Sequence, residues 1–202
     1  MSRPIIAILR GVTPDEVVGI GHALMDAGIT RIEVPLNSPK PLESILRLSD
    51  IFGETAMIGA GTVLTRRDVQ KVDSAGGRLI VSPNFDPDVI DETRKRGLQS
   101  FPGVFTASEC FAALKAGADG LKIFPAFKLG TDGLKALRDV LPSSIQVYAV
   151  GGVGVDDIPA WLAVGANGFG IGGALYKPGA TPEEVSTKAK AFVAAWDHAQ
   201  AS

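Results

Sequence analysis

Short apolar runs alternate with longer amphipathic stretches along the whole chain, and this alternation limits the possible folds more than any other feature. Strand-then-helix units imply a parallel sheet, because neighbouring parallel strands need a crossover connection. Eight such units favour a (β/α)8 TIM barrel, whose usual length is about 250 residues. The chain has 202 residues, so we expect a single α/β domain over residues 1–202 with little room for insertions. The apolar runs are residues 5–9, 31–36, 57–61, 79–82, 99–101, 120–124, 145–150 and 168–171.

Helix start and stop signals separate these runs. Serine, threonine or aspartate before proline or acidic residues is typical of a helix start. Glycine is typical of the position just after a helix. We therefore expect a helix between each pair of runs. The start signals lie at Thr13, Ser38, Thr65, Asp86, Thr106 and Thr181, and the stop signals at Gly28, Gly76, Gly97, Gly117 and Gly165.

An open, doubly wound parallel sheet is the competing architecture. That fold carries a Gly-x-Gly-x-x-Gly fingerprint after its first strand when it binds a dinucleotide. The corresponding stretch here is Leu9-Arg10-Gly11-Val12-Thr13, which lacks the fingerprint. The barrel is therefore the preferred interpretation.

Composition excludes several classes of partner. Hydrophobic residues make up 46% of the chain and charged residues 21%, which is ordinary for a globular protein. The net charge of -2 gives no reason to expect a nucleic acid or an anionic membrane as partner.

The apolar run at residues 5–9 is too short for a secretory signal or a membrane span. A single cysteine, Cys110, fits a reducing cytoplasm, where we expect the protein.

Lys122 is the residue that most directly suggests chemistry. It lies inside the apolar run at residues 120–124, and lysine is rarely buried unless it is paired or functional. Burial favours the neutral amine, which is a nucleophile toward carbonyl groups. The sixth run therefore predicts a reactive amine.

Glu33 is the natural partner for proton transfer. In its run, Ile32 and Val34 alternate with Glu33, so the carboxylate should face the barrel axis while the apolar side chains meet the helices. Lys122 alternates in the same way, and both side chains then enter one cavity. A structural ion pair between Glu33 and Lys122 is the alternative interpretation.

Other candidate residues stand at the C-terminal ends of the runs, where barrel enzymes place their active sites. Arg10 follows the first run and could bind either a substrate anion or a structural carboxylate. Thr62 follows the third run, where a turn or capping role is the alternative. Gly151-Gly152 and Gly172-Gly173 follow the last two runs, where many barrels bind phosphate through backbone N–H groups. Ordinary turn glycines are the alternative for either pair.

The sequence does not indicate a metal site or a catalytic histidine. No histidine, cysteine, aspartate or glutamate residues show metal-ligand spacing, so we expect no metal and no other cofactor. His22 lies in the first helical stretch and His198 near the C-terminus. A histidine general base is therefore not expected, and Cys110 is interpreted as a packing residue.

The chain carries motifs at residues 6–11, 32–38, 58–63, 82–84, 121–125 and 149–153. Together they resemble those of the bacterial 2-keto-3-deoxy-6-phosphogluconate/galactonate aldolases, over nearly the whole chain. The resemblance implies a (β/α)8 class I lyase that forms homotrimers. It also implies that Lys122 forms a Schiff base and that Glu33 is the general acid/base. Arg10, Thr62 and Val150 would contact the substrate, and the two diglycines would bind its phosphate.

Details of two motifs resemble the galactonate branch of this family. Enzymes of the gluconate branch have threonine, arginine and threonine where Pro35, Asn37 and Ser38 stand, and they tend to have threonine in place of Val150. The resemblance therefore implies cleavage of 2-dehydro-3-deoxy-6-phosphogalactonate to pyruvate and glyceraldehyde 3-phosphate. The gluconate epimer as main substrate stays open. So do a non-covalent sugar-phosphate isomerase or epimerase that uses Glu33 as base, and a non-catalytic sugar-phosphate sensor.

Overall fold

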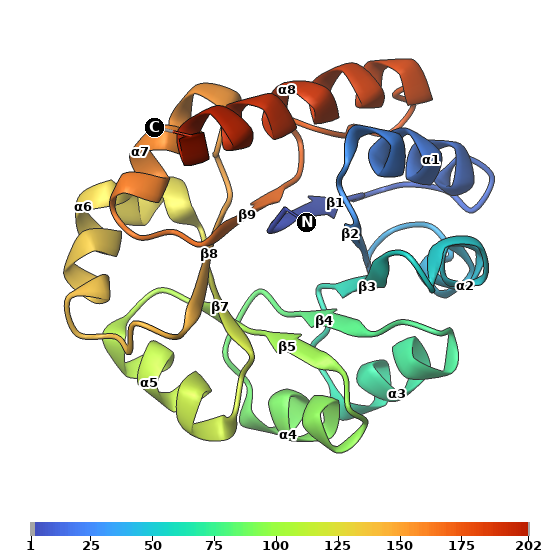
Figure 1. Cartoon of the computed structure of the whole chain (residues 1–202). Coiled ribbons are helices and arrows are strands. Elements are labelled where there is room, and N and C mark those ends of the chain that lie inside the picture. The colour runs from blue at the N-terminus through green and yellow to red at the C-terminus, as the bar shows by residue number, and fades with distance from the viewer. Residues whose placement is uncertain (1–2, 202) are drawn as a thin grey trace.

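Parallel strands form a barrel surrounded by helices in the computed structural model, which describes residues 3–201 (Figure 1). This confirms the (β/α)8 architecture expected from the alternation. The strands are β1 Ile5–Ile8, β2 Arg31–Pro35, β3 Met57–Gly61, β4 Leu79–Val81, β5 Gln99–Phe101, β6 Gly103–Val104, β7 Gly120–Ile123, β8 Gln146–Val150 and β9 Gly168–Ile171. The helices are α1 Val17–Ala27, α2 Pro41–Phe52, α3 Arg66–Ser74, α4 Pro87–Lys95, α5 Ala107–Ala116, α6 Ala126–Arg138, the 3-10 turn η1 Val155–Asp157, α7 Ile158–Ala163 and α8 Pro182–Ala201.

The fifth strand of the barrel is broken into two segments. Pro102 has no N–H to donate to a ladder, and it separates β5 from β6. β5 pairs with β4 and β6 pairs with β7, so the broken strand joins the two halves of the sheet. The sequence predicted residues 99–101 as the strand and missed the second segment.

Alternation along the strands produces two apolar layers. Ile32 and Val34 of β2 face outward into the large core between the strands and the helices. Ile8, Phe101 and Tyr148 belong to a smaller cluster inside the barrel. The inward side chains close the floor of the barrel, so its open end lies at the C-terminal ends of the strands.

Most of the predicted helix starts are confirmed. The side chains of Thr65, Asp86 and Thr106 each accept a hydrogen bond from a backbone N–H of the first helical turn. The starts predicted at Thr13 and Ser38 are wrong. α1 begins at Val17 with Glu16 as its N-cap, and α2 begins at Pro41 after Lys40 adopts a left-handed φ of 41°. Ser38 instead makes a tertiary contact, in which its Oγ accepts a hydrogen bond from the Gly11 N–H at 2.9 Å.

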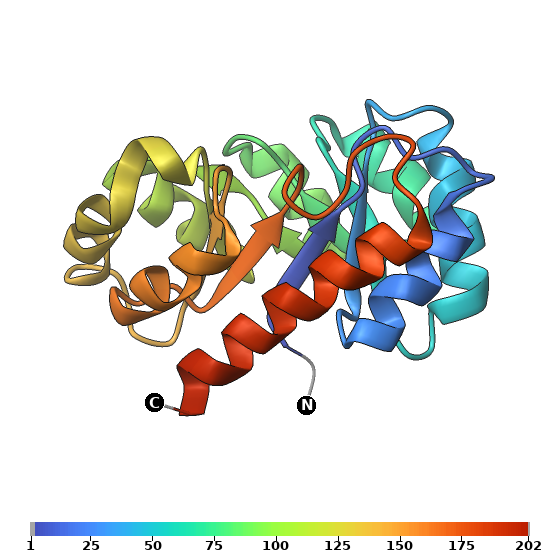
Figure 2. The same cartoon turned by 90° about the horizontal axis from the view of Figure 1, so that it is seen from above.

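The first and last strands close the barrel side by side. β1 lies between β2 and β9, and Figure 2 shows β1 and β9 next to each other behind α8. α8 packs against both α1 and α7. Near the C-terminal end of α8, Asp197 accepts hydrogen bonds from Arg3 on both of its carboxylate oxygens, at 2.7 and 2.6 Å. Within residues 3–201, no helix has both the length and the apolar character needed to cross a bilayer.

Candidate active site

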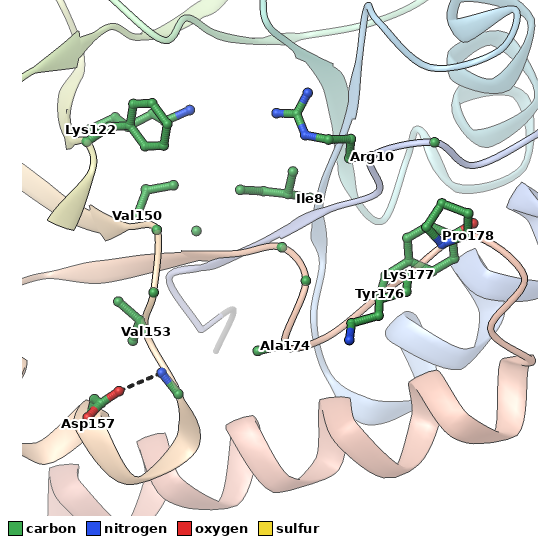
Figure 3. A pocket seen from close by; sticks show the side chains of 18 residues that line it. Ile8, Arg10, Lys122, Val150, Val153, Asp157, Ala174, Tyr176, Lys177 and Pro178 are labelled. Atoms are coloured by element: carbon green, nitrogen blue, oxygen red, sulfur yellow. Dashed lines mark hydrogen bonds between the residues drawn. The ribbon is translucent and has the colours of Figure 1, made fainter. Parts of the chain in front are cut away.

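A cavity of about 780 Å³ opens at the C-terminal ends of the strands (Figure 3). It is lined by Arg10 after β1, Lys122 in β7, residues 151–154 after β8 and residues 172–174 after β9. A second cavity of about 10 Å³, close to the size of a single water molecule, lies deeper in the barrel. Lys122 lines both cavities and Glu33 lines the deeper one. The amine therefore stands between the open mouth and the carboxylate.

Lys122 is held in an environment that disfavours its charge. Only 7% of the residue is exposed, and its Nζ lies 4.9 Å from the centroid of the Phe124 ring. Burial lowers the pKa of Lys122, the negative charge of Glu33 raises it, and the positive charge of Arg10 lowers it further. The net effect is a lowered pKa, which increases the population of the nucleophilic amine at neutral pH.

Glu33 is almost fully buried, with 1% of the residue exposed. Among the residues that the structure describes, its Oε2 has no hydrogen-bond partner. Burial raises the pKa of Glu33 to about 7, against the positive charges of Lys122 and Arg10, which lower it. Among residues 3–201, no direct ion pair joins Glu33 to Lys122. The carboxyl group can therefore both hold and release a proton near neutrality.

Gly61 provides the space that the Glu33 carboxylate occupies. A Cβ atom added at Gly61 would overlap Oε2 and the carboxyl carbon of Glu33. β2 and β3 pair in parallel with Pro35 opposite Gly61, which brings the end of β3 beside the Glu33 side chain. A residue with a side chain at this position would displace the carboxylate.

Two further predicted residues lie in different settings. Arg10 lines the cavity, and its guanidinium points toward Lys122 in Figure 3. Its Nη1 donates to Asn37 Oδ1 at 2.6 Å. Thr62 follows β3 with a φ of 57° and is not among the residues that line the large cavity. Contact between Thr62 and a substrate stays a prediction.

Both diglycines line the large cavity, together with Val150. Gly151 and Gly152 have φ values of 96° and 74°, a backbone region that favours glycine. In the part of the chain that the structure describes, the amides of Gly152 and Gly173 donate to no protein acceptor. Backbone N–H groups of this kind suit an anion.

Sequence reasoning missed two charged residues of this cavity. Lys177 and Asp157 both line it. Asp157 Oδ2 accepts a hydrogen bond from the Gly154 N–H at 2.7 Å, which holds the loop after β8 (Figure 3). Neither residue stands at a strand end, so the rule that located the other residues did not apply to them. Among residues 3–201, no group of three or more histidine, cysteine, aspartate or glutamate side chains is arranged as metal ligands.

Comparison with known proteins yields a family match and close relatives. The family model described as "KDPG and KHG aldolase" matches residues 1–186. The chain is 47% identical to the probable 2-dehydro-3-deoxy-6-phosphogalactonate aldolase of Rhizobium meliloti (strain 1021), over 98% of this chain and 93% of that protein. It is 45% identical to the 2-dehydro-3-deoxy-6-phosphogalactonate aldolase of Escherichia coli (strain K12), over 97% and 96%. A solved structure described as "Native KDPGal structure" is similar, with a TM-score of 0.98, 44% identity and coverage of 100% of this chain and 98% of the other.

Proposed function

Since the chain belongs to the KDPG and KHG aldolase family, we propose that it is a class I aldolase that cleaves 2-dehydro-3-deoxy-6-phosphogalactonate. The products are pyruvate and glyceraldehyde 3-phosphate. The preference for the galactonate epimer is supported by the names of the two relatives at 45% and 47% identity. Pro35, Asn37 and Val150 also support it, because they depart from the gluconate pattern. Val150 presents an apolar side chain to the cavity.

The observation that carries the proposal is the buried pair of Lys122 and Glu33. The neutral amine of Lys122 attacks the C2 ketone of the substrate and forms a carbinolamine. Loss of water, with the proton supplied by Glu33, leaves a protonated imine that acts as an electron sink. A pKa of about 7 suits Glu33 to give and take protons in successive steps.

Bond cleavage follows from this electron sink. The ionised Glu33, directly or through a water, accepts the proton of the C4 hydroxyl. The C3–C4 bond then breaks, its electron pair moves into the imine as an enamine, and the C4 aldehyde leaves as glyceraldehyde 3-phosphate. Protonation of the enamine at C3 and hydrolysis of the imine release pyruvate and restore Lys122.

The remaining cavity residues bind the two anionic ends of the substrate. The free amides of Gly152 and Gly173, in the two diglycine loops Gly151-Gly152 and Gly172-Gly173, receive the phosphate, with Lys177 adding positive charge. The Arg10 guanidinium points toward Lys122 (Figure 3), which supports a role for it in binding the carboxylate that adjoins the imine carbon. Arginine suits this role because its planar fork of donors matches a carboxylate.

Borohydride trapping tests this proposal. Incubation with pyruvate and borohydride, followed by mass spectrometry of the intact protein and its peptides, should give one reduced pyruvate adduct on Lys122. Lys122→Ala should give no adduct and no turnover. Lys177→Met is the matched control, since Lys177 lines the same cavity but is exposed, and pyruvate has no phosphate. An unmodified wild-type chain would instead favour a non-covalent isomerase or a sugar-phosphate sensor.

The resemblance also supports a homotrimer that acts in the cytoplasm. Phe105, Phe111 and Phe127 are exposed by 38%, 46% and 60%, and burial between subunits would remove such apolar surface from water. Light scattering during size-exclusion chromatography should give a mass of three chains. A monomer at micromolar concentration would contradict this assembly.

A further inference from the structure

Arg10 is tied to the segment that follows the neighbouring strand. Its Nη1 donates to Asn37 Oδ1 at 2.6 Å, although the two residues are 27 positions apart in the chain. Arg10 follows β1 and Asn37 follows β2, and these strands pair in parallel. The bond therefore crosses the mouth of the barrel from one strand end to the next.

A second hydrogen bond joins the same two segments without involving the arginine side chain. The Gly11 N–H donates to Ser38 Oγ at 2.9 Å, and Ser38 is buried. The two segments thus stay together when the first bond is removed. The hydrogen bond between Arg10 and Asn37 is therefore not needed to hold the two segments together, and its effect is to fix the position of the guanidinium.

We propose that Asn37 is a positioning residue that holds the Arg10 guanidinium toward the substrate carboxylate beside Lys122. This role rests on the proposed aldolase function. The carboxylate of a 2-keto acid is bonded to the carbon that joins Lys122 Nζ, so it stays near this amine through the whole reaction. Guanidinium carries five N–H donors, and the bond to Asn37 leaves most of them available for the carboxylate.

The advantage of this arrangement is preorganisation. A free arginine side chain loses rotamer freedom when it becomes fixed. Asn37 orders the guanidinium before the substrate arrives, so less of that cost falls on binding. Asparagine supplies the acceptor without a negative charge, so the positive charge of Arg10 stays available to the substrate.

Steady-state kinetics in the condensation direction test the role. Wild type, Asn37→Leu and Ser38→Ala are compared with pyruvate and glyceraldehyde 3-phosphate as the two varied substrates. Asn37→Leu removes the acceptor but keeps the number and branching of the side-chain heavy atoms, and the KM for pyruvate should rise about tenfold. The KM for glyceraldehyde 3-phosphate should stay unchanged, since its phosphate binds at the glycine loops. Ser38→Ala, which loosens the same two segments, should leave the KM for pyruvate unchanged.

A double-mutant cycle shows whether Asn37 acts through Arg10. Arg10→Met should raise the KM for pyruvate by itself, and adding Asn37→Leu to that variant should produce no further rise. Additive effects, equal effects of Asn37→Leu and Ser38→Ala, or a parallel rise in both KM values would overturn the positioning role. If wild type forms no borohydride-trapped pyruvate adduct, the aldolase function itself fails and this role fails with it. If wild type forms the adduct and the kinetic predictions still fail, only the positioning role of Asn37 is refuted.

Discussion

Substitution of Glu33 by glutamine should stabilise the protein in a pH-dependent way. Glu33 is 1% exposed, and its Oε2 has no hydrogen-bond partner within residues 3–201. A buried carboxylate without a partner opposes folding once it ionises. Glutamine keeps the shape of the side chain and removes the ionisation.

The magnitude follows from the pKa of Glu33. Burial raises this pKa from 4.5 to about 7. Below pH 4.5 the carboxyl group is protonated in both the folded and the unfolded chain, so it has no effect on the pH dependence. Between pH 4.5 and 7 the unfolded chain loses this proton first, and stability falls by about 1.4 kcal/mol per pH unit. Above pH 7 the full penalty of about 3 kcal/mol is present, equivalent to roughly 10 °C in Tm for a chain of this size.

Urea unfolding of wild type and Glu33→Gln between pH 4.5 and 8 measures this penalty. The difference in unfolding free energy should be small at pH 4.5 and grow in favour of the variant up to pH 7. Glu109→Gln is a control of opposite sign, because backbone N–H groups lower the pKa of Glu109 and ionisation there stabilises the fold. Its destabilisation should be present throughout this pH range, and in measurements below pH 4.5 it should disappear as the pH falls through the lowered pKa of Glu109. A Glu33→Gln variant less stable than wild type at pH 8, or a difference that does not vary with pH, would refute the reasoning.

Three further substitutions test other parts of the structure. The Cβ of Gly61→Ala would overlap the Glu33 carboxylate, which is the proton-transfer group of the proposed mechanism. Misplacement of such a group can cost about a hundredfold in rate, so kcat in an aldolase assay should fall by that factor; wild-type kcat would contradict this. Tyr148→Phe removes the hydrogen bond that Arg31 Nη1 donates to the Tyr148 hydroxyl at 2.7 Å, and a loss of about 1.5 kcal/mol is expected in urea unfolding. Thr106→Ala removes the side-chain cap of α5 and should cost about 1 kcal/mol in the same assay, so an unchanged unfolding midpoint would show that the cap contributes nothing.

Local signals account for the parts of the fold that the sequence predicted. Thr65, Asp86 and Thr106 cap their helices with bonds that reach only two or three residues along the chain, so their types and spacing suffice. Glu33 and Lys122 were placed inside the barrel because a strand alternates its side chains strictly. These features depend on a few neighbouring residues.

Contacts between distant segments account for what the sequence did not predict. Ser38 was interpreted as a helix start, but its hydroxyl accepts from Gly11, 27 residues earlier. The bond between Arg10 and Asn37 and the entry of Lys177 into the cavity depend likewise on how separate strand ends meet. The raised pKa of Glu33 depends on a burial that only the closed barrel creates.

The pairing of β1 with both β2 and β9 has a consequence for synthesis on the ribosome. β1 and β2 are made within a short interval, whereas β9 is made near the end of the chain. At ribosomal rates of about 5–20 residues per second, the edge of β1 that pairs with β9 stays unpaired for on the order of 10 seconds. An unpaired strand edge is a template for pairing with other chains. In the folded barrel both edges of β1 are paired. The risk of aggregation through β1 is therefore limited to the interval before β9 is synthesised.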